Sequence, residues 1–524
     1  MSQYNSSNNL AALGYDVLHL ILLHLCGDSG RSTDWRDVLA VSVVSKSLRN
    51  YALPVIFRDV CWPKKGTPEF YPPELWVHIR RLTLVEARWA TGHNHELALL
   101  ILSQILSQLP SLVTFVYPMR VPPSLAFLTC LAENPLPSIQ TLEVSTSFLL
   151  RNFVHRFNEI SGIRKLVIKQ PDNTSLHAAP EYIQRQSMNC VTNMVMGCRE
   201  TLFELDVPGE HFSLAAFACS ESNFPCLKKL VLRGYPPVDW DQYPIWQVLR
   251  CMPKISSVEV CCRLRMIGIS PQRYVLMPRD ASPPPGEPNL FPSLLETLVI
   301  CNPSLTDNIL RRLPHSLKCL VLDFVPYWDR VMASGDLLAY HALEKMTQTF
   351  RAMRHAMGSV PNLEHLRINM GWCISPELLK CICDLFPGLR ILELQGIRYF
   401  NRGGEPESDL SAFVNTLSQL HFLETLKLAV ELKEDPYRDG GYRKIGSVDE
   451  SSQTWANTLA ASIPRLKSIA FEARAHTGKT IGSRSLVGEP LWLWYFLDKK
   501  GDTNLMRRSG EPVDWDLLDK SFRW

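Results

Sequence analysis

The segment Ala473 to Thr480 is the part of the chain that most resembles a catalytic or nucleotide-binding motif. It follows an apolar, strand-like stretch and ends in Gly478-Lys479-Thr480, as a phosphate-binding loop does. Ala473, however, stands where a glycine begins the tight turn of such a loop. No obvious helix follows to offer its backbone amides to a phosphate. We therefore predict an ordinary loop here, with nucleotide binding at Lys479 as the alternative.

Two close pairs of potential metal ligands occur, His93 with His95 and Cys381 with Cys383. A zinc site needs three or four protein ligands, and neither pair has further ligands that the sequence identifies. Both pairs are predicted to be structural. No motif combines a nucleophile with a general base, and no glycine-rich dinucleotide fingerprint is present. The sequence predicts no catalytic residue, no metal site, no cofactor and no enzymatic activity.

Composition narrows the class of partner. Among 524 residues, Lys plus Arg number 55 and Asp plus Glu number 52, so the net charge of +3 gives little attraction to nucleic acid or to an acidic membrane. The 15 cysteines form an odd set without a CxxC pair, which favours buried, reduced thiols. No apolar stretch is long enough to span a bilayer. We expect a cytoplasmic or nuclear protein that binds neither nucleic acid nor membrane.

The elements that position any site come from a repeated phrase: an apolar residue, two others, Leu, one other, Leu. Pro387-Gly388-Leu389-Arg390-Ile391-Leu392-Glu393-Leu394 is one copy, and a proline often stands two residues before the first apolar position. The thirteen first positions are Ile79, Leu112, Ile139, Ile163, Leu202, Leu227, Ile255, Leu295, Leu317, Leu363, Leu389, Leu423 and Leu466. The end of each phrase alternates as a strand does, and helical spacing follows between copies.

A strand–helix unit of this kind cannot bury its apolar side alone. Stacked units share one core, with a parallel sheet on the concave face and helices outside. We predict helices over 95–109, 125–133, 148–159, 181–196, 242–250, 305–312, 337–357, 376–386, 410–420 and 452–463. First positions lie from 22 residues (Leu295 to Leu317) to 46 residues (Leu317 to Leu363) apart, so the array is irregular. Insertions are predicted at 263–289, 323–336, 398–409 and 431–450, as binding loops or as tolerated surface segments.

Charged residues at the non-core strand positions are predicted to face the concave side. The cations there form our candidate target-binding set: Arg81, Lys165, Lys229, His365, Arg367 and Lys427. Carboxylates share these positions, namely Glu143, Glu204, Asp206, Glu259 and Glu393. The mixture of signs indicates a protein-binding surface or simply a solvated sheet face, because an oppositely charged ligand favours a groove of one sign.

Before the array lies a polar leader, then a helical module. The segment 13–25 is apolar around nearly its whole circumference, with only Asp16, His19 and His24 as a polar edge. Helices are also predicted over 37–44 and 46–53, the last ended by Pro54. A unit of this size cannot cover that much apolar surface by itself. The excess predicts a bound partner or docking against the repeats.

Residues of this module resemble the F-box. The matching residues are Leu13-Gly14-x-Asp16-Val17-Leu18-x-x-Ile21-Leu22-x-x-Leu25, then Val38-Leu39-Ala40-Val41-Ser42-x-Val44-Ser45-Lys46-x-Leu48, with a fungal-type ending at Ala52-Leu53-Pro54-Val55-Ile56-Phe57-Arg58. The resemblance implies binding to a Skp-type adaptor and, through it, to a cullin and RING ubiquitin ligase. It further implies that eight residues contact the adaptor or support that contact: Leu13, Val17, Leu18, Ile21, Leu22, Leu25, Leu39 and Val43.

The array is similar to the leucine-rich repeats that often follow an F-box, as in the unit Leu295-Glu296-Thr297-Leu298-Val299-Ile300-Cys301. The expected fold class is α/β, a short N-terminal F-box followed by an irregular leucine-rich-repeat solenoid. The expected divisions are a disordered leader (1–10), the F-box (11–60), a Pro-rich connector (61–78), the solenoid (79–471) and an aromatic-rich cap (472–524). Aromatic residues at Leu491 to Phe496, and Trp515, Phe522 and Trp524, would seal the end of the array.

Three functional hypotheses follow, of which the third is an enzyme built on the Lys479 loop. In the first, the chain is the non-catalytic substrate receptor of an SCF-type ubiquitin ligase, with an unknown target held by the solenoid. In the second, the solenoid is an interaction scaffold that acts without a ligase. The helical module would then be a cap over the open end of the array.

Overall fold

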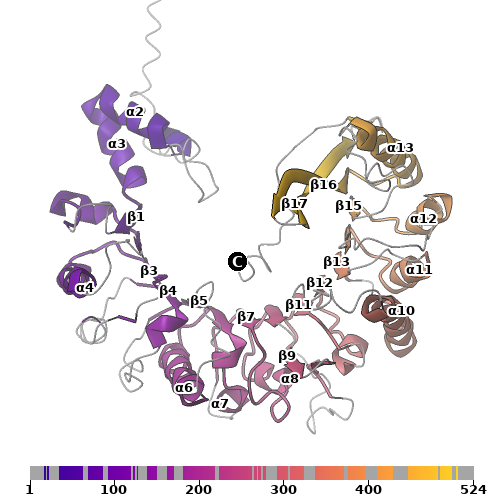
Figure 1. Ribbon diagram of the computed structural model, residues 1–524, viewed down its shortest axis with the longest axis horizontal. Helices are drawn as coiled ribbons and strands as arrows, with labels where there is room; N and C mark the ends of the chain where they lie inside the picture. The colour runs from indigo at the N-terminus through magenta and orange to yellow at the C-terminus, as the bar shows by residue number, and fades with distance from the viewer. Residues whose placement is uncertain are drawn as a thin grey trace, which may run out of the picture. The chain divides into compact units, whose positions relative to one another are not determined.

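The fold was taken from a computed structural model (Figure 1). It describes residues 17–18, 20–22, 35–62, 69–85, 93–119, 122–123, 127, 139–149, 162–169, 181–218, 223–262, 265–267, 270–272, 275–278, 292–304, 307–323, 337–360, 362–370, 376–396, 410–428, 446–481, 484–497 and 503–504. The chain forms two compact units, Met1–Val207 and Pro208–Trp524. Each is a row of mostly parallel strands with helices on one face (Figure 1). We call the opposite face of the strands the helix-free face.

The first unit contains parallel strands in chain order, each paired with the next. They are β1 (Asp59–Trp62), β2 (Arg81–Leu84), β3 (Thr114–Tyr117), β4 (Thr141–Ser145), β5 (Lys165–Lys169) and β6 (Glu204–Pro208). The second unit continues the pattern. Its parallel strands are β7 (Lys229–Gly234), β8 (Ser257–Cys262), β11 (Thr297–Cys301), β12 (Cys319–Asp323), β13 (His365–Met370), β14 (Ile391–Gly396), β15 (Thr425–Leu428) and β16 (Ser468–Ile481).

The repeated phrase accounts for this sheet. Each of the thirteen copies becomes a strand, β2 to β8 and β11 to β16, so the predicted repeat is confirmed. Strands pair with equivalent positions aligned, as Leu366 with Leu392 in β13 and β14. The leucine positions of the phrase face the helices and are buried, for example Leu363, Leu366 and Ile368. Repetition of the phrase therefore sets both the register and the buried face. The α/β fold is an irregular leucine-rich-repeat solenoid.

Helices lie between the strands. They are α4 (His93–Leu106), α6 (Glu181–Cys198), α7 (Leu214–Ala218), α8 (Ile245–Leu249), α10 (Leu337–Met357), α11 (Pro376–Leu385), α12 (Leu410–Leu417) and α13 (Gly446–Ser462). Most match the predicted segments, whereas α7 was not predicted. The predicted helix 305–312 is instead the 3₁₀ helix η7 (Asn308–Arg311), because the short repeat from Leu295 to Leu317 leaves room for only one turn. Of the predicted helices 125–133 and 148–159, residues 125–126, 128–133 and 150–159 lie outside the described residues.

The N-terminal module contains α2 (Trp35–Val44) and α3 (Lys46–Ile56). The prediction that Pro54 ends α3 was wrong, because the helix continues to Ile56. Proline removes one helical hydrogen bond, but Phe57 N–H still donates to the Leu53 carbonyl at 3.0 Å, and Val55 is buried in the module core. Packing of the last turn therefore outweighs the missing bond.

The sheet begins one strand earlier than the sequence indicated. β1 follows α3 directly and pairs with β2, so Asp59 and Val60, placed in the F-box range, and Cys61 and Trp62, placed in the connector, belong to the sheet. The connector itself contains the 3₁₀ helix η2 (Pro73–His78). An edge-to-face cluster of aromatic rings joins Trp62, Phe70, Tyr71 and Trp76, with Phe57 at the end of α3 packed on Tyr71. This cluster ties the module to the first repeat.

The C-terminal end of the second unit is a hairpin. β16 runs on to Ile481 and pairs antiparallel with β17 (Arg484–Leu497), which pairs with β18 (Thr503–Asn504). Ala473 to Thr480 therefore lie in a strand, and the predicted loop there was wrong. Tyr495 in β17 is buried against Phe471, with ring centroids 5.8 Å apart. Trp515, Phe522 and Trp524 lie outside the described residues.

The insertion 263–289 is partly anchored. It contains the antiparallel hairpin β9 (Arg265–Ile267) and β10 (Ser270–Gln272). Beyond it, the Val275 carbonyl accepts a hydrogen bond from Trp240 Nε1 at 2.7 Å, and Leu276 and Met277 are buried. Residues 324–336, 398–409 and 431–445 of the other predicted insertions lie outside the described residues.

Candidate functional site

The N-terminal module has a small core of its own. Leu22 from the first helical segment, Val38 from α2, and Ala52 and Val55 from α3 form one buried cluster. Val41, Tyr51 and Ile56 pack around it. Ser45 joins the two later helices: its Oγ caps α3 by accepting a hydrogen bond from Leu48 N–H at 3.1 Å. The cap and the core fix the angle at which α2 and α3 present their remaining side chains.

Several other apolar side chains of the module face solvent. Val43 and Val44 are each 72% exposed, and Leu20 is 65% exposed. With Val17, Ile21 and Leu39, which are also exposed, they make up what we call the apolar patch. Val17 and Ile21 lie four residues apart on the first helical segment, as Leu39 and Val43 do on α2, so each pair shares a helix face. Leu22 and Val38 both lie in the core. The residues next to them in sequence, Ile21 and Leu39, therefore lie at the edge of the core and are exposed.

The eight residues implied by the resemblance divide into two groups. Val17, Ile21, Leu39 and Val43 are exposed and available to a partner, whereas Leu18 and Leu22 are buried and support the module from within. Leu13 and Leu25 lie outside the described residues. Leu20 and Val44 were not in the set although both are exposed. Their signal was present in the sequence, as apolar residues beside Ile21 and Val43.

Exposed apolar side chains that lie together on two elements of one small module are typical of a protein-binding interface. Isolated exposed apolar residues are ordinary, but six from a module with this small a core constitute a patch. Removing such side chains from water on binding contributes roughly 25 cal/mol per Å² of apolar area. The patch can therefore bind another protein but supplies no group for a chemical reaction.

The six candidate target-binding cations lie on the helix-free face, and each pairs with a carboxylate on a nearby strand. The nitrogen–oxygen distances are 3.0 Å for Arg81–Glu143, 2.9 Å for Lys165–Glu204, 2.6 Å for Lys229–Glu259, 3.3 Å for His365–Glu393, 3.8 Å for Arg367–Asp323 and 3.2 Å for Lys427–Glu393. Glu143 also pairs with Lys169 at 2.9 Å. The ion pairs neutralise much of the charge that a target could use. Target binding by these residues stays a prediction.

Arg367 differs from the other five cations because it is buried. Asp323, its partner on β12, is completely buried, and no hydrogen bond from the described part of the chain reaches either of its carboxylate oxygens. Burial raises the pKa of Asp323, and Glu393 adds to that effect while Arg367 opposes it. A buried Arg beside buried carboxylates mainly compensates their charge. Arg367 thus has a structural role on the face where a target was expected.

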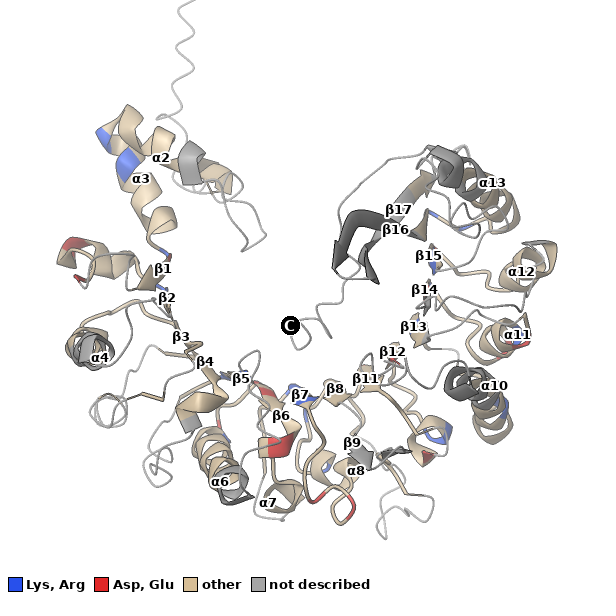
Figure 2. Ribbon diagram, viewed as in Figure 1, with Lys and Arg blue, Asp and Glu red and all other residues tan. Residues whose placement is uncertain are grey.

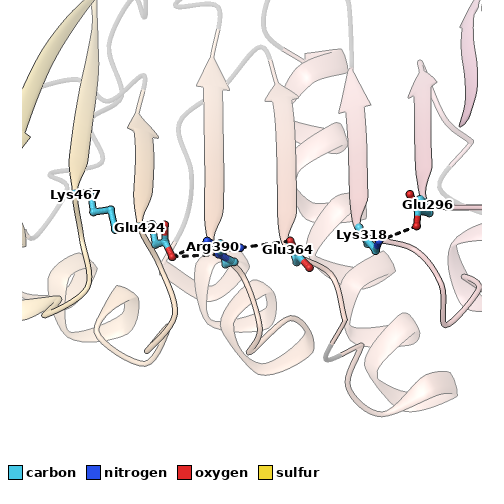
Figure 3. Close-up of polar contacts among 6 residues, drawn as sticks. All are labelled: Glu296, Lys318, Glu364, Arg390, Glu424 and Lys467. Atoms are coloured by element: carbon cyan, nitrogen blue, oxygen red, sulfur yellow. Dashed lines mark hydrogen bonds and ion pairs between the residues drawn. The ribbon is translucent and has the colours of Figure 1, made fainter.

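A separate row of charged residues runs along the starts of the strands in the second unit. It occupies the position after the first apolar residue of the phrase, and its signs alternate over six successive repeats (Figure 3). The residues of this charge ladder are Glu296, Lys318, Glu364, Arg390, Glu424 and Lys467. Arg390 lies 2.8 Å from Glu424 and 3.9 Å from Glu364, and Lys467 lies 2.6 Å from Glu424. Because the ladder is neutral overall, it connects repeats rather than attracting a ligand.

The potential chemical sites do not assemble. Lys479 lies in strand β16, whose backbone pairs with β17, rather than in a phosphate-binding loop. His93 and His95 lie two apart on α4, and Cys381 and Cys383 two apart on α11, so neither pair shares a helix face. Burial raises the pKa of Cys383 to about 12. Among the described residues, no group of three or more His, Cys, Asp or Glu side chains could hold a metal ion.

Within the described part of the chain, none of the helices combines the length and the apolar character needed to cross a bilayer. Lys and Arg are interspersed with Asp and Glu over both units (Figure 2). The apolar patch is therefore the feature of the described surface that most clearly indicates a binding function.

Comparisons with known proteins add a fold-level likeness. No protein-family model matches the sequence, and no curated protein matches it either. Among solved structures, the chain is similar to the complex of Rad7 and Elc1 from yeast, with 13% identity, 75% of this chain and 91% of that chain covered, and a TM-score of 0.30. It is also similar to the leucine-rich repeat-containing protein LegL7 from Legionella pneumophila, with 11% identity, 88% and 97% covered, and a TM-score of 0.30. At these values the likenesses carry no information about function.

Proposed function

We propose that the chain is the substrate-recognition subunit of an SCF-type ubiquitin ligase. The N-terminal module binds a Skp-type adaptor, which links it to a cullin and a RING protein, and the solenoid binds a target protein. The observation that carries the proposal is the apolar patch, on a module whose sequence resembles the F-box. A patch of this kind is stabilised when a partner protein covers it.

In this role the chain performs no chemistry. It holds the target near the ubiquitin-charged partner of the ligase, so that transfer becomes effectively intramolecular and its rate depends on effective concentration. The catalytic residues lie in other chains, no cofactor is needed here, and the protein works in the cytoplasm or the nucleus. The half-buried cations of the helix-free face, such as Lys165 and Lys229, and the insertions are the places where target contacts are expected.

The test compares substitutions on the apolar patch with a matched substitution elsewhere. Val43→Asp places a charge on the patch, at a highly exposed side chain that is not part of the module core. Burying that charge under a partner is costly, so we expect adaptor binding to weaken by at least about a hundredfold. Val238→Asp, the same change at a residue that is 55% exposed in the second unit, should leave binding unchanged.

Binding of the purified full-length chain to a purified Skp-type adaptor is the measurement, with circular dichroism to verify that each variant is folded. Leu22→Asp is unsuitable as a surface probe because Leu22 belongs to the module core. If the wild-type chain fails to retain the adaptor where a known F-box protein retains it, the ligase proposal is lost. The solenoid is then an interaction scaffold without a ligase, the alternative function.

A further inference from the structure

The border of the apolar patch carries an excess of positive charge. Between Val38 and Arg58 the chain contains three cations, Lys46, Arg49 and Arg58, and no carboxylate. Lys46 and Arg49 lie near the start of α3 and are exposed, and α3 shows blue residues but no red ones (Figure 2). In the charge ladder, by contrast, the cations alternate with carboxylates. Over this segment the module therefore carries charge of one sign only.

Both cations lie beside the most exposed part of the patch. Lys46 follows Val43 and Val44 in sequence, separated from them only by the capping residue Ser45. Arg49 Nε donates a hydrogen bond to the Ser42 carbonyl at 3.3 Å, which lays its side chain along the last turn of α2 next to Val43. A partner that covers Val43 and Val44 must therefore come within a few ångströms of two positive charges.

These charges are not explained by stability alone. Neither Lys46 nor Arg49 forms an ion pair within the described part of the chain. A cation in the first turn of a helix is also unfavourable, because the helix dipole places partial positive charge there and favours Asp or Glu. Arg49 offsets this through its bond to the end of α2, but Lys46 has no such contact among the described residues. Residues that violate a local preference without compensation often serve binding.

We propose that the partner which covers the apolar patch presents an acidic edge to Lys46 and Arg49, so that charge steers the association. This inference rests on the proposed function, in which that partner is a Skp-type adaptor. Opposite charges at the rim of an interface mainly raise the association rate and make it sensitive to salt, while the apolar centre sets how long the complex lasts. Lys46 is thus the steering residue and Val43 the anchor.

The test is the association rate of the full-length chain with a purified Skp-type adaptor at about 0.05 M and about 0.5 M salt. Lys46→Glu should lower the association rate constant roughly tenfold at low salt and less than about twofold at high salt, with little change in the dissociation rate. Glu is the preferred residue type at the start of a helix, so this variant should be no less stable than the wild type. Slower binding is then not caused by unfolding.

Two controls complete the design. Arg58→Glu makes the same charge change beyond the far end of α3, on the order of 15 Å along the helix axis, and should alter the rate less than about twofold. Arg49→Gln removes one charge and should have an intermediate effect, with circular dichroism checking that the α2–α3 junction is intact. If the wild type binds but Lys46→Glu associates as fast and with the same salt dependence, this inference is overturned and the proposed function stands. If the wild type does not bind at all, both fall.

Discussion

At the scale of single residues, the helix-free face is a set of compensated charges. His365 illustrates this. Burial by itself lowers the pKa of His365, but contact of its Nδ1 with the Cys319 Sγ at 3.4 Å and of its Nε2 with Glu393 outweighs burial and raises the pKa to about 9. Burial likewise raises the pKa of Glu393, yet His365, Lys427 and Arg367 lower it to about 2. The pair is therefore charged over the whole neutral range.

This pair predicts a pH dependence of stability. The contribution of His365 is fully present below about pH 6.5 and is lost as the pH rises through 9, because its pKa is raised on folding. That of Glu393 is present above about pH 4.5 and is lost as the pH falls through 2. His365→Gln should lower the free energy of unfolding by roughly 1–3 kcal/mol near pH 6, and by less near pH 10. Denaturant unfolding across pH measures the difference.

The control for this prediction is His355→Gln, at an exposed histidine on α10. It should shift stability little at either pH. A deficit of His365→Gln that is the same at pH 6 and pH 10 would show that the ring matters for packing and not for its charge.

At the scale of elements, the repeated phrase has two structural roles. Its leucines bury one face of each strand, and the residue after the first apolar position supplies the charge ladder. Adjacent parallel strands lie roughly 4.8 Å apart, so side chains at equivalent positions are neighbours. Because the signs alternate, each charged side chain is attracted to its neighbours on the adjacent strands. A row of charges of one sign would instead repel one another. The ladder therefore favours the correct order and register of the repeats.

Reversing one charge of the ladder tests this role. Arg390→Glu places three carboxylates in a row, with Glu364 and Glu424 on either side. Exposed pairs are individually weak, so we expect the unfolding midpoint of the second unit to fall by about 1–3 °C at low salt. Arg351→Glu is the matched control, since among the described residues Arg351 forms an ion pair only with Glu377, at 3.1 Å, outside the ladder. It should produce a smaller fall, and about 1 M salt should remove the difference between the two variants. Equal effects of both variants would argue against a cooperative row.

At the scale of the whole molecule, stability should be local. Repeat proteins are held together by contacts between neighbouring repeats, so damage in one place spreads poorly along the chain. The N-terminal module adds its own core around Val38 to this arrangement, and the aromatic cluster of Trp62, Phe70, Tyr71 and Trp76 connects it to the first strands. A defect in the module core should therefore stay within the first unit.

Hydrogen exchange on the full-length chain tests this expectation. Val38→Asp puts a charge into the module core, and exchange in α2 and α3 should accelerate by at least about tenfold while β12 to β15 exchange as in the wild type. Leu392→Asp, at a fully buried position in β14, should produce the opposite pattern. Loss of protection in both units from either variant would mean that the chain unfolds as one cooperative body.

The local sequence by itself determined much of the fold of this protein. The spacing of apolar residues predicted the strands, their parallel stacking and the side of each strand that is buried, because these follow from the geometry of a single element repeated along the chain. It also indicated that the module has more apolar surface than it can cover. The early start of the sheet at β1 was missed, since Val60 and Trp62 stand where the phrase has its two leucines.

Only the tertiary structure decided which apolar residues of the module are core and which are surface. Leu18 and Leu22 are buried while Val17 and Ile21, on the same helical segment, are exposed, because burial depends on what packs against a helix rather than on its own periodicity. The same holds for charge: pattern placed Arg367 and His365 on one face, but their carboxylate partners come from other strands, far away in sequence. Distances between distant segments, and the pKa values that depend on them, exist only once the chain is folded.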